Sequence, residues 1–107
     1  MSERLEKISK LVKELCATFL NSESSGASLI SVSSATVSPD IKRATIYITA
    51  LPESQEKTAL LFAKRKRPEM REYLKKHMQT KMVPFLEVEI DRGEKNRILI
   101  DELLRQK

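Results

Sequence analysis

Residues 64–71 read Lys64-Arg-Lys-Arg-Pro68-Glu-Met-Arg71, a run of positive charge interrupted by a proline. The residues before it, from Glu53 to about Arg67, have a helix-forming composition. Pro68 has no backbone N–H and disfavours helical conformation at the residue before it, so that helix should stop or kink there. Proline is also well suited to the first turn of a helix, so a second helix is predicted from Pro68 to Gln79. The sequence therefore predicts two consecutive helices that meet at a corner.

The start of the chain is predicted to form an amphipathic helix from about Glu3 to Leu20, because apolar residues recur at spacings of three and four. These residues are Leu5, Ile8, Val12, Leu15 and Phe19. Turn-forming residues between Asn21 and Gly26 should end this helix. Cys16 lies beside the apolar stripe and is expected to be a small core residue.

Two strands are predicted to follow the first helix as an antiparallel hairpin. The first runs from Ser28 to Ser38, and its apolar alternation changes phase, which predicts a bulge near Ser33-Ser34. The turn Ser38-Pro-Asp40 leads to a half-buried second strand. The inward residues of this second strand are expected to be Ala44, Ile46, Ile48 and Ala50.

A third strand is predicted to begin at Pro84, with Leu86, Val88 and Ile90 on its inner face. A short final helix is expected from Glu94 to Arg105. The predicted order is therefore α–β–β–α–α–β–α, a single α+β domain over residues 1–107 with a three-stranded sheet packed on helices.

The positive charge of the chain is concentrated in the segment from Lys64 to Met82. This segment holds eight basic and two acidic residues, or +6, whereas the whole chain has 20 basic and 15 acidic residues, or +5. A localised basic surface can replace the counterions around a phosphate backbone. The candidate nucleic-acid-binding residues are Lys64, Arg65, Lys66, Arg67, Arg71, Lys75, Lys76 and Lys81. The alternative is a solvated, Lys-rich helix face that binds nothing.

The corner at Pro68 strengthens the first interpretation. A helix that begins there would direct free backbone N–H groups and a positive dipole end toward the basic rim. Backbone amides and cationic side chains would then converge on one place, which suits a phosphate backbone.

The sequence does not contain the motifs that are typical of enzymes, nucleotide-binding proteins or zinc proteins. His77 is the only histidine and lies on the apolar side of its helix, with no nucleophile or orienting carboxylate at a recognisable spacing. The two glycines, Gly26 and Gly93, form no phosphate-binding loop. Cys16 is the only cysteine, and one Cys with one His cannot build a zinc site. We therefore predict no enzymatic activity, no cofactor, no metal and no small-molecule substrate.

The amino-acid composition of the chain further limits the kinds of binding partner that we expect. Aromatic residues make up only 5% of the chain and Trp is absent, so base stacking on an aromatic platform is not expected to be the main binding mode. No segment has the length and apolarity of a signal peptide or a membrane span. We expect a cytoplasmic protein, without a membrane partner, that acts as a monomer.

Several stretches, taken together, resemble the ribosome-binding factor A family, whose fold is a type II KH-like domain. The matching stretches are Val37-Ser-Pro-Asp40, Ala44-Thr-Ile-Tyr-Ile48, Arg71, Val83-Pro84-Phe-Leu86, Asp91, Arg97-Ile98 and Leu103-Leu104. The resemblance implies an RNA-binding assembly factor for the small (30S) ribosomal subunit that contacts 16S rRNA and aids its late maturation. It also implies that the protein has no catalytic activity.

The kink between the two middle helices departs from that family. Relatives have an Ala-x-Gly kink there, whereas this chain has Lys66-Arg67-Pro68, so Pro68 would supply the bend by breaking the helix. Two alternatives remain open: a general single-stranded nucleic-acid-binding KH-like module, and an interaction protein whose basic corner docks an acidic protein rather than a nucleic acid.

Overall fold

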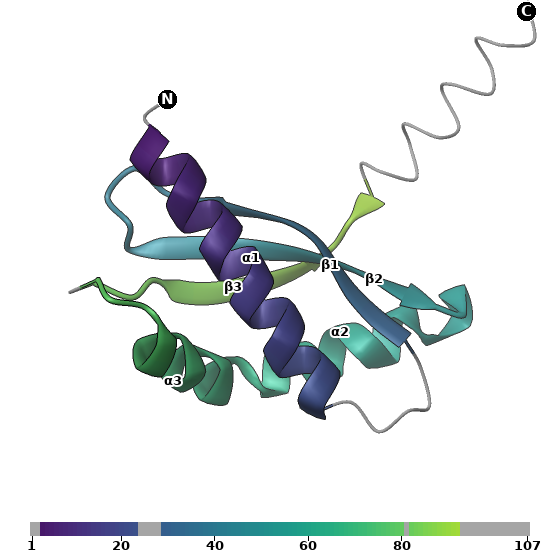
Figure 1. Cartoon of the computed structure of the whole chain (residues 1–107). Helices are drawn as coiled ribbons and strands as arrows, with labels where there is room; N and C mark the ends of the chain where they lie inside the picture. Colours follow the sequence, from purple (N-terminus) through teal and green to yellow (C-terminus); the bar gives the residue numbers. More distant parts are fainter. Residues whose placement is uncertain (1–2, 24–28, 81, 93–107) are drawn as a thin grey trace, which may run out of the picture.

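The computed structural model describes residues 3–23, 29–80 and 82–92 and has an α+β fold (Figure 1). The elements are α1 Glu3–Glu23, β1 Leu29–Val37, β2 Arg43–Leu51, the 3-10 helix η1 Glu53–Gln55, α2 Glu56–Arg65, α3 Arg67–His77 and β3 Phe85–Ile90. Their order is the predicted one as far as the third strand. The predicted final helix, Glu94 to Arg105, lies outside the described residues.

The sheet has the order β1-β2-β3. The β1–β2 pair is antiparallel and carries a register shift between Val32 and Ser34, so both the predicted hairpin and the predicted bulge are confirmed. The β2–β3 pair is parallel, because α2 and α3 form the crossover connection that carries the chain back to the same end of the sheet. This pairing places Arg43 beside Phe85.

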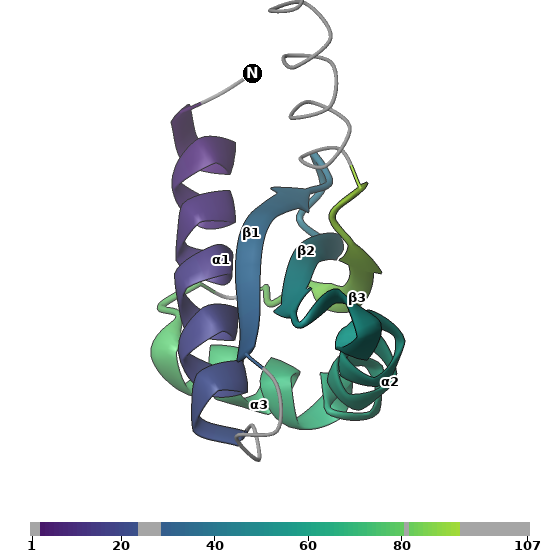
Figure 2. The ribbon, with the colours of Figure 1, turned by 90° about the vertical axis from the view of Figure 1, so that its right-hand side faces the viewer.

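The core lies between the helices and one face of the sheet. Figure 2 shows α1 along β1 and α2 beside β3, with α3 close to the lower part of α1. The predicted inward residues of β2 and β3 are buried. In α1 the buried residues are Ile8, Val12, Cys16, Phe19 and Leu20. Cys16 is thus a core residue as predicted, while Leu5 and Leu15 are only half-buried.

The predicted corner is present between α2 and α3. α2 ends at Arg65, α3 begins at Arg67, and Lys66 between them has φ −89° and ψ 2°, outside the α-helical region. Pro68 therefore occupies the second position of α3 rather than the first. The break falls two residues ahead of the proline, and Pro68 has no N–H to donate to the carbonyl of Lys64.

Candidate nucleic-acid interface

A groove of about 710 Å³ lies between the α2–α3 corner and β3. Its cationic lining consists of Arg43, Lys64, Arg65, Arg67 and Arg71. Pro68, Phe85 and Leu86 also line it, as do two acidic residues, Glu72 and Glu87. The cations of the corner therefore face the start of β3 across the groove. Positive charge converges there, as a phosphate backbone would require.

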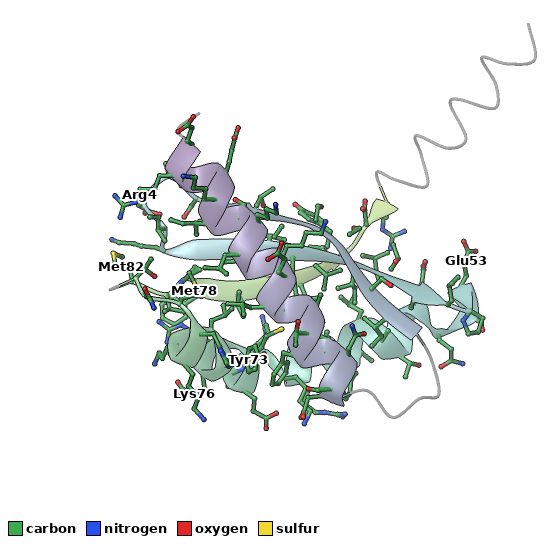
Figure 3. The ribbon with its side chains drawn as sticks, viewed as in Figure 1. Arg4, Glu53, Tyr73, Lys76, Met78 and Met82 are labelled. Atoms are coloured by element: carbon green, nitrogen blue, oxygen red, sulfur yellow. The ribbon has the colours of Figure 1, made fainter. Side chains whose placement is uncertain are left out.

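A second hollow adjoins the groove. Lys42, Arg43, Arg71, Met82, Val83 and Phe85 line it, and Figure 3 labels Met82 at this end of the molecule. Arg43, Arg71 and Phe85 line both hollows, so Phe85 stands between two cationic depressions. The turn after β1 supplies Lys42, which places a further positive charge at the far end of this surface.

The acidic residues of the groove are each held by a cation. Glu87 accepts from Nη1 of Arg67 at 3.0 Å, and Glu72 is paired with Nζ of Lys75 at 3.0 Å. These pairs neutralise both carboxylates. The groove therefore keeps a net positive charge from Arg43, Lys64, Arg65 and Arg71.

The guanidinium group of Arg67 has two partners within the protein. Its Nε–H donates to the backbone carbonyl of Lys64 at 3.0 Å, and its Nη1 bonds Glu87 on β3. The Lys64 carbonyl is the acceptor that Pro68 leaves without an N–H donor. Arg67 thus caps the broken helix and ties the corner to the sheet, which leaves its guanidinium less available to an outside phosphate than the sequence suggests.

Lys66 and Lys75 are also engaged within the protein. Nζ of Lys66 lies 3.2 Å from a carboxylate oxygen of Glu23, at the end of α1, and 3.1 Å from one of Glu69. The hydrogen bonds with Glu69 and then with Glu23 raise the pKa of Lys66 above its ordinary value. Lys66 therefore joins the corner to α1 and does not line the groove.

Arg71 is half-buried and serves a structural role as well. Its Nη2 donates to the carbonyl of Val83 at 3.1 Å, and its guanidinium carbon lies 4.2 Å from the centre of the Phe85 ring. Its Nε is buried and has no hydrogen-bond partner. Arg71 thus fixes the approach to β3 and covers one face of Phe85.

Four predicted site residues carry no ion pair in the described part of the chain: Lys64, Arg65, Arg71 and Lys76. Lys64 and Arg65 line the groove, whereas Lys76 is exposed on α3 away from it. Lys81 lies outside the described residues. Of the eight predicted cations, the structure thus brings four together in the groove, Lys64, Arg65, Arg67 and Arg71, and the role of all eight in binding remains a prediction.

Three residues of the interface were not predicted from the sequence: Lys42, Arg43 and Phe85. Arg43 begins β2 and Phe85 begins β3, and they become neighbours only through the parallel pairing of these strands. The alternation of each strand did indicate that both face away from the core. Knowledge of the strand register was needed to place them beside the corner.

The contribution of backbone amides at the start of α3 stays a prediction. Pro68 lies in the first turn and has no N–H, so it removes one of the expected donors, while no side chain caps this helix end. Glu69, in the same turn, is paired with Nζ of Lys66.

Residues 3–23, 29–80 and 82–92 offer neither a metal site nor a membrane span. They contain no group of three or more His, Cys, Asp or Glu side chains that could hold a metal ion. No helix within them is long and apolar enough to cross a membrane.

Comparison with known proteins supports the family resemblance. The family model described as ribosome-binding factor A matches residues 4–104. The crystal structure of ribosome-binding factor A from Thermus thermophilus is similar, with a TM-score of 0.74, 20% identity, and coverage of 82% of this chain and 97% of that one. No curated protein matches this chain significantly.

Two further solved structures are similar. The solution structure of a Thermotoga maritima protein described as a putative ribosome binding factor A has a TM-score of 0.71 and 19% identity, with 87% of this chain and 92% of that one covered. A homology model of the Thermus thermophilus factor, fitted into a cryo-EM map of a 30S complex, has a TM-score of 0.68 and 21% identity, with 78% and 91% covered. At these identities the likeness shows the fold.

Proposed function

Because the chain belongs to the ribosome-binding factor A family, we propose that it binds the small (30S) ribosomal subunit and acts as an assembly factor in the maturation of 16S rRNA. A relative of the same fold has been fitted into the map of a 30S complex. We assign the protein no catalytic activity and no cofactor. We propose that the protein acts as a monomer in the cytoplasm, where ribosomal subunits are assembled.

The observation that carries this proposal is the groove at the α2–α3 corner. Its two carboxylates are neutralised by Arg67 and Lys75, while Arg43, Lys64 and Arg65 have no acidic partner among the described residues. Unpaired cations that converge on one hollow favour a polyanion, and rRNA offers a regular array of phosphates.

The test is sedimentation of the purified protein with isolated 30S, 50S and 70S particles. We expect it to pellet with 30S particles only. If about five phosphates are neutralised, raising the salt from about 50 to 200 mM should weaken binding more than about a hundredfold. Binding that does not depend on salt would overturn the phosphate-directed mode, and equal binding to all particles would favour a general nucleic-acid-binding module.

A pair of charge-reversal variants locates the binding face. Lys64→Glu with Arg65→Glu reverses two cations of the groove, whereas Lys7→Glu with Lys10→Glu reverses two exposed cations of α1. Both variants change the net charge by the same amount. We expect only the groove variant to lose 30S binding, and the opposite result would place the interface on α1.

A further inference from the structure

Phe85 is an exposed aromatic residue in the middle of the cationic surface. Its exposed fraction is 64%, and it lines both hollows. A single exposed apolar residue is ordinary on a protein surface. An exposed ring with a guanidinium stacked over one face and cations on both sides has the chemistry of a base-stacking site.

Arg71 covers one face of the Phe85 ring, and the exposure of the ring leaves its other face for a ligand. Arg71 covers one face at 4.2 Å, and Nη2 of Arg71 is anchored to the Val83 carbonyl, so this cover is held in place. Arg43 is the neighbour of Phe85 across the β2–β3 pair. The backbone at Phe85 is also fixed, since its N–H donates to the carbonyl of Lys42 at 2.9 Å. The ring is therefore positioned before any ligand arrives.

We propose that Phe85 stacks on the base of an unpaired nucleotide, while the phosphates on either side of that nucleotide lie in the two hollows beside Arg43 and Lys64. This inference rests on the proposed function and specifies which part of an RNA the groove takes. A nucleotide carries a planar apolar base and an anionic phosphate in one unit, which matches a ring between cations. A base within a continuous helix has both faces covered by its neighbours, so the target would be a loop, a bulge or a single-stranded end.

The alternative occupant is an acidic protein segment with an apolar side chain seated on Phe85. It fits the surface less well, because the cations extend on both sides of the ring, from Lys42 in one hollow to Lys64 in the other. A strand of RNA places a phosphate on each side of every base. The fluorescence of a labelled RNA separates these two occupants.

The probe is a short single-stranded RNA that carries a fluorescent adenine analogue at its centre, compared with a hairpin in which the same analogue is base-paired. Stacking on an aromatic ring should quench the analogue in the single strand and leave the paired one unchanged. The variants are Phe85→Leu, which keeps an apolar side chain but removes the ring, and Phe85→Tyr, which keeps the ring. Leu61→Ala, at an exposed apolar residue on α2 outside both hollows, is the matched control.

We expect quenching with the native protein, Phe85→Tyr and Leu61→Ala, and none with Phe85→Leu. Phe85→Leu should also bind the single strand roughly 5- to 150-fold more weakly. Equal quenching and affinity for Phe85→Leu would overturn the proposal. Loss of 30S binding by Phe85→Leu without any quenching in the native protein would also overturn it and would indicate a protein contact.

The groove variant and the ring variant separate stacking on Phe85 from the proposed function. The groove variant Lys64→Glu with Arg65→Glu tests the phosphate contacts and does not touch the ring. If that variant loses 30S binding while Phe85→Leu retains it fully, the proposed function stands and the stacking does not. If neither variant affects 30S binding, the binding face lies outside the groove and the stacking fails, whereas a native protein that does not pellet with 30S particles overturns the proposed function.

Discussion

Arg67 donates its Nε–H to the backbone carbonyl of Lys64, three residues earlier, across the break between α2 and α3. In an uninterrupted helix that carbonyl would accept the N–H of residue 68, which proline lacks. The side chain beside the proline thus replaces the missing backbone donor. One residue of the basic run is therefore a structural part of the corner.

Substituting Arg67 by lysine tests this cap. Arg67→Lys keeps the positive charge but removes the Nε–H donor, so the free energy of unfolding should fall by about 1 kcal/mol. Lys64→Ala is the matched control, because it removes a side chain while the carbonyl that accepts the bond remains, and it should change stability by no more than about 0.5 kcal/mol. Chemical denaturation measures both. Equal stability of the two variants would show that the bond contributes nothing.

Arg71 is the second cation whose main partners are internal. Arg71→Glu removes the hydrogen bond to Val83 and the contact with Phe85, so we expect a loss of about 2 kcal/mol in the free energy of unfolding. Lys76→Glu makes the same charge change at an exposed site of α3 and should stay within about 0.5 kcal/mol. A melting curve for each variant compares their stabilities. An Arg71→Glu protein as stable as Lys76→Glu would show that Arg71 has no structural role.

The elements of this fold were predictable because their signals are local. The phase change between Val32 and Ala35 indicates the bulge, since alternation within a strand has a period of two whatever the strand pairs with. Pro68 indicates the corner for an equally local reason, the missing N–H. The helix α1 nevertheless extends to Glu23, three residues beyond the prediction, across residues that favour turns.

The composition of the interface was less predictable because it depends on contacts between distant residues. A run of basic residues indicates that cations are present, but not which of them meet an acidic residue. Lys66 pairs with Glu23 from α1, and Arg67 pairs with Glu87 from β3, at sequence separations of 43 and 20. Phe85 joins the groove only through strand register. The low aromatic content argued against stacking as a general mode, yet one well-placed ring is sufficient for one base.

Pro68 is predicted to set the angle of the corner and, with it, the binding surface. Pro68→Ala would restore an N–H that can compete with Arg67 for the Lys64 carbonyl and favour a continuous helix. Burial of Ala63 and Met70 on the two sides of the break should resist this change, so we expect a modest loss of stability and a larger loss of 30S affinity.

Pro68→Gly is the matched variant for the corner. Glycine disfavours a continuous helix, so the bend and most of the binding should remain, and the 30S affinity of Pro68→Gly should exceed that of Pro68→Ala. Sedimentation with 30S particles over a range of protein concentrations gives both affinities. Near-native affinity for both variants would show that tertiary packing alone sets the corner and that the proline is incidental.

Cys16 should make the stability of the fold depend on alkaline pH. Burial in α1 raises the pKa of this thiol from its ordinary value of 9.0 to about 12. Above pH 9.0 the unfolded thiol therefore loses its proton while the folded thiol keeps it, so the unfolded state gains stability as the pH rises. The contribution of Cys16 to the free energy of unfolding is complete below that pH and falls by up to about 1.4 kcal/mol per pH unit above it.

The matched variant for this pH dependence is Cys16→Ala, which removes the thiol but keeps a small apolar side chain in the core. Every other titratable group is the same in both proteins, so the difference between the two pH slopes isolates Cys16. Chemical denaturation of both proteins at several pH values on each side of 9.0 gives these slopes. We expect the native protein to lose stability more steeply than Cys16→Ala. Parallel slopes would mean that the thiol ionises as easily in the folded state as in the unfolded one, which a side chain enclosed by the core of α1 and the sheet should not permit.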